Sequence, residues 1–159
     1  ERATSRLIQS TLEEHAYFLL LTERWLDDEG WGAIRPVIEQ YAKQQKVPAL
    51  LRPFLIAAVR KSVVAQCKAQ GTGRLSPSER LNLAKEVFDA LSVYLGDQDF
   101  LLGNQPHTVD CTAYAFVAMG TVNEITSPLH VMVRSYPNLM AYADRIQRLC
   151  ASARTPAAR

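Results

Sequence analysis

The sequence predicts an all-α fold, and three observations support this prediction. Long segments repeat apolar residues at intervals of three and four, and little of the chain alternates apolar and polar residues as a β-strand would. Glycine and proline residues stand at the ends of these segments, where helices begin and end. The 159 residues are 48% hydrophobic and 21% charged, so the chain can bury a core. We therefore expect residues 1–159 to form a single helical domain.

The first helix is expected over about residues 4–28, with Gly30 ending it. Two apolar lines run along it: Ile8, Leu12, Leu19 and Leu26, then Leu7, Phe18, Leu21 and Trp25. A helix that is apolar along two lines packs from two directions, so this one is predicted to be central. His15 falls on the first line, which favours a core or half-buried imidazole.

The next two helices are expected over about residues 34–41 and from Pro48 or Pro53 to about Gln70. Gly71 is well placed to end the longer one in a left-handed turn. Its inward-facing residues are predicted to be Phe54, Ala58, Val59 and Val63. The glycines of the following link, Gly71 and Gly73, come after a helix rather than a strand, which favours a structural link over a phosphate-binding loop.

A helix start signal stands at Ser76-Pro77-Ser78-Glu79. The Ser76 side chain can accept from the amide of Glu79, whose carboxylate can reach back, and Pro77 suits a first helical turn. The helix that it opens is expected to end at Gly96. Further helices are expected over about residues 109–120, 127–133 and from Tyr136 or Pro137 to about Ala151, followed by a frayed tail over residues 152–159.

Composition excludes several classes of function. Eighteen basic and sixteen acidic side chains give a net charge of +2, so no nucleic-acid-binding surface is indicated. The longest apolar run, residues 16–21, is too short to cross a membrane. Neither the three cysteines nor the three histidines have metal-ligand spacing, so no metal is expected, and unpaired cysteines favour a reducing, cytoplasmic setting. The chain begins at Glu1 without a signal peptide, and we expect it to be a domain of a longer protein.

The first predicted helix also carries a polar stripe. Ser10, Glu13 or Glu14, Tyr17 and Arg24 recur at helical spacing and so share a face. A solvated face is one interpretation. The other is that the face lines a cleft against a domain outside this chain, where Arg24 binds a carboxylate and Tyr17 donates a hydrogen bond to an anion.

Four motifs together resemble the glutathione transferase superfamily. FLLGNQPHTVDCTAYAFV, residues 100–117, is similar to the start of the family's sixth helix, and SYPNLMAYADRI, residues 135–146, to the helix start that follows it. EEHAYFLLLTERW, residues 13–25, and QGTGRLSPSE, residues 70–79, resemble the branch of failed-axon-connections (Fax) and metaxin-like proteins and their bacterial relatives. The resemblance extends over about residues 5–150.

The resemblance implies the C-terminal, all-helical domain of a two-domain protein. The N-terminal thioredoxin-like domain of this family holds glutathione and supplies the catalytic group, so no catalytic residue is assigned to this chain. The domain is expected to shape the site of a small hydrophobic electrophile in a homodimeric glutathione transferase-like enzyme and to be inactive alone. The residues predicted to face that pocket are Ser10, Glu14, Tyr17, Leu21 and Arg24. The alternative is a non-catalytic binding or scaffold protein of the Fax or metaxin type.

Within the resemblance, Asp110 matches the family's helix-capping aspartate. Its carboxylate is expected to accept unpaired amides at the helix start, and Asp110→Ala is predicted to cost about 1–2 kcal/mol. His107 stands where the family pattern has Ser or Thr, and Thr108 is a candidate to replace it with a shift of one residue. The four structural caps predicted from the sequence are Asp110, Thr108, Ser76 and Glu79.

Overall fold

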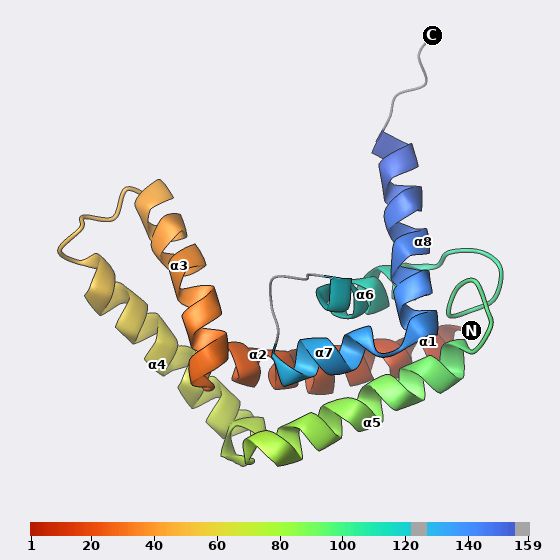
Figure 1. Cartoon of the computed structure of the whole chain (residues 1–159), viewed down its shortest axis with the longest axis horizontal. Coiled ribbons are helices and arrows are strands. Elements are labelled where there is room, and N and C mark those ends of the chain that lie inside the picture. The colour runs from red at the N-terminus through yellow and green to blue at the C-terminus, as the bar shows by residue number, and fades with distance from the viewer. Residues whose placement is uncertain (122–126, 155–159) are drawn as a thin grey trace, which may run out of the picture. The chain divides into compact units, whose positions relative to one another are not determined.

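The computed structural model describes residues 1–121 and 127–154 (Figure 1). Every regular element in these two ranges is a helix, and the β-pairing there is an isolated bridge between Phe100 and Gly103. The prediction of an all-α fold is confirmed. No helix within the described residues is long and apolar enough to span a bilayer.

The chain divides into two compact units, which are described in turn. Unit 1 combines residues 1–16 with residues 85–159, and unit 2 comprises residues 17–84. The expectation of a single domain over residues 1–159 stays a prediction.

Unit 1 is built around α6. Its elements are α1 (Arg2–Thr11), the π-helical segment η1 (Leu12–Ala16), the later part of α5 (Pro77–Leu95), α6 (Thr108–Val117), the 3-10 helix η3 (Ala118–Thr121), α7 (Pro128–Arg134) and α8 (Pro137–Arg154). Helix α6 contacts α1, η1 and α8, and α8 also contacts α7 and η3. Phe88, Val117 and Tyr142 are among the fully buried side chains of this unit. Burial of each large apolar side chain contributes about 1.5–3 kcal/mol to folding.

Unit 2 is built around α2. Its elements are α2 (Tyr17–Trp25), α3 (Asp28–Gln44), α4 (Arg52–Gln70), the 3-10 helix η2 (Thr72–Arg74) and the start of α5. Helix α2 contacts α3, α4 and η2, and α3 and α4 run side by side as a hairpin (Figure 1). The side chains of Leu19, Leu20 and Ile56 are buried in this unit.

The predicted role of Gly30 is wrong, because it lies inside α3 rather than at a helix end. Helix α2 ends at Trp25, Asp27 occupies the N-cap position of α3 in an extended conformation, and α3 begins at Asp28. The acidic residues that follow α2 therefore open a helix, where negative charge stabilises the positive end of the helix dipole. A Cβ atom on Gly30 would lie 2.0 Å from the carbonyl oxygen of Glu23, so this glycine permits the close contact of α3 with α2.

The continuous first helix predicted over residues 4–28 is interrupted by η1. A π-helical turn holds more residues than an α-helical turn, so the i, i+3, i+4 spacing used for the prediction does not carry across residues 12–16. His15, predicted to be buried or half-buried, is consequently exposed. Leu7, predicted on an apolar line, is 70% exposed.

The predicted inward face of α4 is also wrong. Phe54 is 70% exposed, Ala58 and Val59 are exposed, and Val63 is half-buried. The buried residues are Ile56 and Cys67. Arg60, four residues after Ile56, shares this inward face, and a charged residue in that position hid the apolar periodicity.

Several helix ends agree with their sequence signals. Helix α4 begins one residue before Pro53 and ends at Gln70, where Gly71 has a φ of 120°. Helix α5 ends at Leu95, before Gly96 with a φ of 53°. Helix α8 continues to Arg154, three residues beyond its predicted end, and the rest of the predicted frayed tail, residues 155–159, lies outside the described residues.

Candidate functional site

A buried carboxylate organises unit 1. Asp110 is 2% exposed and sits in the first turn of α6. Its Oδ2 accepts the His107 amide at 2.7 Å, and its Oδ1 accepts the Leu101 amide at 2.9 Å and the Tyr142 hydroxyl at 2.8 Å. We call Asp110, Tyr142 and these two amides the Asp110 cluster. It joins the loop before α6, the start of α6 and α8.

The Asp110 cluster is built for folding rather than proton transfer. Burial raises the pKa of the Tyr142 hydroxyl far above its usual value, and its hydrogen bond to Asp110 raises it further, so the phenol stays protonated. Both oxygens of Asp110 accept from donors of the chain itself, and the residue is 2% exposed, so the carboxylate is not presented to a substrate. Sequence reasoning found Asp110 but missed Tyr142, which is the eighth residue of the SYPNLMAYADRI motif.

The start of α6 differs from the predicted cap at Thr108. His107 occupies the N-cap position in an extended conformation, and Thr108 is the first, exposed helical residue, so the proposed shift of one residue does not occur. The Asp110 amide donates to the main-chain carbonyl of His107 at 3.0 Å. The His107 amide therefore donates to the Asp110 carboxylate, and the His107 carbonyl accepts from the Asp110 amide.

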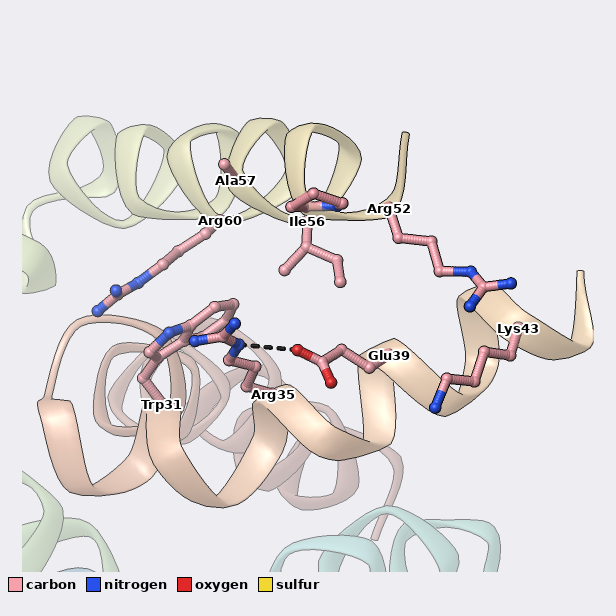
Figure 2. A pocket seen from close by; sticks show the side chains of 9 residues that line it. Trp31, Arg35, Glu39, Lys43, Arg52, Ile56, Ala57 and Arg60 are labelled. Carbon is pink, nitrogen blue, oxygen red and sulfur yellow. Dashed lines mark hydrogen bonds and ion pairs between the residues drawn. The ribbon is translucent and has the colours of Figure 1, made fainter. Parts of the chain in front are cut away.

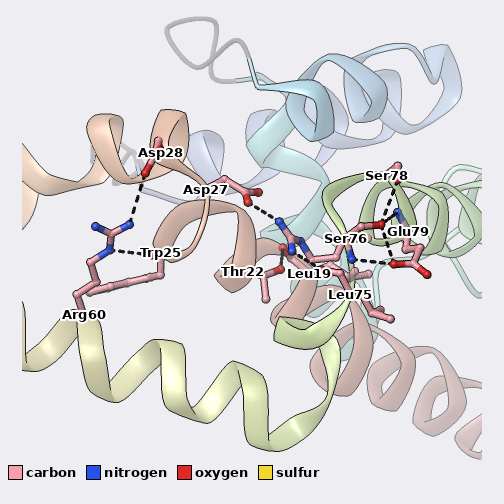
Figure 3. A network of polar contacts seen from close by, with 11 residues as sticks. Leu19, Thr22, Trp25, Asp27, Asp28, Arg60, Leu75, Ser76, Ser78 and Glu79 are labelled. Atoms are coloured by element: carbon pink, nitrogen blue, oxygen red, sulfur yellow. Dashed lines mark hydrogen bonds and ion pairs between the residues drawn. The ribbon is translucent and has the colours of Figure 1, made fainter.

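A second polar network lies in unit 2, at the start of α5 (Figure 3). The Ser76 amide donates to Glu79 at 2.7 Å, and the Glu79 amide donates to the Ser76 hydroxyl at 3.3 Å, as a reciprocal capping box does. The Ser76 hydroxyl also donates to Glu79, and these hydrogen bonds lower the pKa of Glu79 below its usual range.

Arg80 joins this helix start to the turn between α2 and α3. Its side chain is 8% exposed, pairs with Asp27 and donates to the Leu75 carbonyl at 2.7 Å. A buried guanidinium requires such partners, because leaving it unpaired costs several kcal/mol. Both groups of this ion pair are therefore engaged in holding unit 2 together.

The five predicted pocket residues fall in different parts of the structure. Ser10 is half-buried in α1 and Glu14 is exposed in η1, both in unit 1. The other three lie in α2 of unit 2, at spacings of four and three that keep them on one face: Tyr17, Leu21 and Arg24. Their assignment to a substrate pocket stays a prediction.

Two of these residues, Tyr17 and Arg24, have features suited to binding an anion. Tyr17 is 47% exposed and packs edge-on against Phe18 with ring centroids 5.3 Å apart. Arg24 is half-buried, and its side chain makes no hydrogen bond or ion pair within the part of the chain that the structure describes. The guanidinium is thus available for a carboxylate or another oxyanion.

Unit 1 contains an apolar cavity of about 210 Å³ between α1, η1 and α5. Leu7, Ile8, Leu91 and Tyr94 contribute to its lining. The cavity is too small for a drug-sized molecule but matches a small apolar group. Over residues 1–121 and 127–154, no three metal-ligating side chains are grouped as a metal site would require.

The comparisons with known proteins identify the family. Residues 84–146 match the family described as "Glutathione S-transferase, C-terminal domain". The chain contains a glutathione S-transferase C-terminal domain. The matched residues include Asp110 and Tyr142, so the Asp110 cluster belongs to the family's part of the structure, and the resemblance seen in the sequence is confirmed.

Relatives of this glutathione S-transferase C-terminal domain occur in both enzymes and metaxins. Isoprene-epoxide--glutathione S-transferase of Rhodococcus sp. (strain AD45) is 32% identical over 143 residues, which cover 86% of this chain and 56% of that protein. Metaxin-1 of Homo sapiens is 26% identical over 155 residues, with 92% of this chain and 32% of that protein covered. Metaxin-2 of Mus musculus is 27% identical over 126 residues, with coverage of 79% and 46%.

The chain therefore spans about a third to just over half of the length of these curated relatives. No solved structure matches the chain at a comparable level of significance.

Proposed function

We propose that the protein of which this domain is part is a cytoplasmic, homodimeric glutathione transferase, in which the domain shapes the site of a small hydrophobic electrophile. The observation that carries the proposal is the 32% identity to a glutathione S-transferase along 86% of the chain. Glutathione would be held mainly by an N-terminal thioredoxin-like domain. We take a small epoxide as the electrophile class, following the name of that relative.

The chemistry of the proposed reaction balances within the two substrates. The glutathione thiol loses a proton and its thiolate attacks an epoxide carbon, so that a C–S bond forms and the C–O bond breaks. The resulting alkoxide takes up one proton, which balances the proton that the thiol lost. A donor placed near the developing oxyanion lowers the barrier, because it interacts more strongly with the transition state than with the epoxide. Tyr17, which is 47% exposed, and Arg24, whose side chain makes no hydrogen bond or ion pair within the described residues, are the groups of this chain suited to bind that anion.

The remaining pocket candidates would determine which electrophile fits. Leu21 lies between Tyr17 and Arg24 on the same face of α2 and offers an apolar contact. Ser10 and Glu14, on α1 and η1 of unit 1, stay candidates for a role in electrophile specificity. These residues shape specificity and perform no chemical step.

The test uses the protein with its upstream domain. We expect it to bind immobilised glutathione and to conjugate glutathione to a small epoxide. Arg24→Gln and Tyr17→Phe should lower kcat/KM for the epoxide about tenfold or more while leaving the KM for glutathione unchanged. Tyr41→Phe, which changes an exposed tyrosine of α3, is the matched control. Equal activity of all three variants would refute the pocket assignment.

The second candidate function is a non-catalytic binding or scaffold protein of the Fax or metaxin type. It is supported by the similarity to two metaxins, one of which covers 92% of the chain. In that case the two-domain protein neither binds immobilised glutathione nor turns over the epoxide, although it folds and dimerises. The same assay therefore separates the two proposals.

A further inference from the structure

Unit 2 contains a groove between α3 and α4 that the family match, residues 84–146, does not include (Figure 2). Its volume is about 450 Å³, within the usual size of small-molecule sites. Two rows of side chains face each other across it. Trp31, Arg35, Glu39 and Lys43 recur every four residues on α3, and Arg52, Ile56 and Arg60 recur every four residues on α4. This spacing aligns each row on one face of its helix.

The charges of the groove are unbalanced. Four of its lining side chains are basic, namely Arg35, Lys43, Arg52 and Arg60, and only Glu39 among the lining residues is acidic. Glu39 is already paired with Arg35 at 2.9 Å. The remaining three cations face a partly enclosed space, where like charges repel one another unless an anion lies between them.

At one end of the groove, the guanidinium of Arg60 already has partners within the chain. The Arg60 guanidinium lies over the Trp31 ring, 4.4 Å from its centroid, and its Nε donates to the Trp25 carbonyl at 3.0 Å. Asp28 lies 4.0 Å from the same group. This end therefore supplies a fixed aromatic wall rather than a free charge.

The opposite end of the groove carries two cations, Lys43 and Arg52. Figure 2 shows Lys43 and Arg52, on different helices, at the end of the groove away from Trp31, and both line the groove. Arg52 Nε donates to the Val47 carbonyl at 2.8 Å, which fixes the guanidinium and leaves its two terminal nitrogens available. Within the described residues, neither Lys43 nor Arg52 is paired with a carboxylate.

We propose that this groove binds a small amphiphilic organic anion. Its anionic group lies between Lys43 and Arg52, where a preoriented guanidinium offers two donors to an oxyanion. Its apolar body lies along Ile56 and Ala57, toward the end of the groove that holds Trp31. The site is independent of the proposed transferase chemistry, because no residue of the groove belongs to the electrophile pocket and binding requires no glutathione.

The probe is 8-anilino-1-naphthalenesulfonate, an aromatic anion whose fluorescence rises on binding, titrated into the intact chain. Arg52→Gln should weaken its binding about tenfold, because a charge-assisted hydrogen bond is lost. Lys43→Gln should weaken it about threefold, as expected for a more exposed charge. The Lys43 side chain makes no hydrogen bond or ion pair in the described residues, so this variant keeps the fold.

Two controls separate the groove from general binding of the dye to apolar surface. The variant Arg2→Gln/Arg6→Gln removes two exposed charges of α1 and should bind the dye as the unaltered chain does. N-phenyl-1-naphthylamine, the neutral analogue, should bind weakly and equally to every variant. Equal affinity of the sulfonate for the unaltered chain and for Lys43→Gln/Arg52→Gln, with unchanged circular dichroism, would overturn the proposal.

Discussion

Replacement of Asp110 tests the structural argument most directly. Asp110→Ala removes the carboxylate that accepts three hydrogen bonds, and the three donors differ in whether another acceptor is within reach. The His107 amide lies at an exposed position and can bond to water, and the Tyr142 hydroxyl also lies 3.3 Å from the Asp110 main-chain carbonyl. The Leu101 amide belongs to a residue that is 1% exposed and keeps no protein acceptor in the described structure.

The expected cost follows from these differences. The unsatisfied Leu101 amide costs about 1–3 kcal/mol, and loss of the helix cap costs about 1 kcal/mol more. The longer hydrogen bond that remains to the Tyr142 hydroxyl adds roughly a few tenths of a kcal/mol. We therefore expect Asp110→Ala to lower the free energy of unfolding by about 2–4 kcal/mol, above the 1–2 kcal/mol predicted from the sequence motif alone. The melting temperature should fall by roughly 5–15 °C.

Asp110→Asn is the informative companion variant. An asparagine whose oxygen replaces Oδ1 still accepts from Leu101 and Tyr142. Its NH2 group then faces the His107 amide, and this exposed amide can donate to water instead. We therefore expect a loss of about 1 kcal/mol, clearly smaller than that of the alanine variant.

Urea denaturation followed by circular dichroism measures both variants, with Ser76→Ala as a reference for an exposed cap. Ser76→Ala should cost about 1 kcal/mol. If Asp110→Ala costs no more than Ser76→Ala, the buried hydrogen bonds of the Asp110 cluster contribute nothing beyond capping. If Asp110→Asn is as damaging as Asp110→Ala, the assignment of the two oxygens is wrong.

Two further predictions concern α3 and the hydrogen bond from Tyr136, the residue before α8, to Asp89 of α5. Gly30→Ala should lower the free energy of unfolding by about 1–3 kcal/mol in a urea titration, because the added Cβ has no room. Gly32→Ala, whose added Cβ meets nothing within 4 Å, should raise it by about 0.5–1 kcal/mol. Equal effects of the two variants would refute the close contact of α3 with α2. Hydrogen bonds from Lys85 and then Tyr136 lower the pKa of Asp89, so its contribution to stability is present above the usual carboxyl range and is lost as the pH falls through the lowered value. Tyr136→Phe should raise the pKa of Asp89 in an NMR titration and weaken the acid dependence of stability, and an unchanged pKa would contradict this.

Helix ends were predictable where a single residue type fixes the backbone. Gly71 and Gly96 adopt positive φ, and Ser76 and Glu79 close a capping box through groups only three residues apart. These signals are local, so the sequence contains all of the information that they need. The bounds of α4 and α5 follow from them.

Features that depend on distant contacts were not predictable in the same way. Gly30 matches a helix terminator in the sequence, and only the packing of α3 on Glu23 shows why a glycine is required there. The π-helical turn of η1 leaves no signal in composition, yet it changes the exposure of His15. Tyr142 gains its partner Asp110 from 32 residues away in the chain.

The groove of unit 2 shows how charge can conceal a helix face. A search for apolar periodicity passes over Arg52 and Arg60, although both stand at intervals of four with the buried Ile56. The stem of an arginine packs against apolar surface while its guanidinium reaches a polar partner, so such a residue can occupy an inward position. Arg60 does so through Trp31 and the Trp25 carbonyl, whereas the two terminal nitrogens of Arg52 have no partner in the part of the chain that the structure describes. The two arginines lie on one face of α4 but differ in how many partners their guanidinium groups have within the described residues. Arg60, which has more partners, stabilises the fold, whereas Arg52 has donors with which it can bind a ligand.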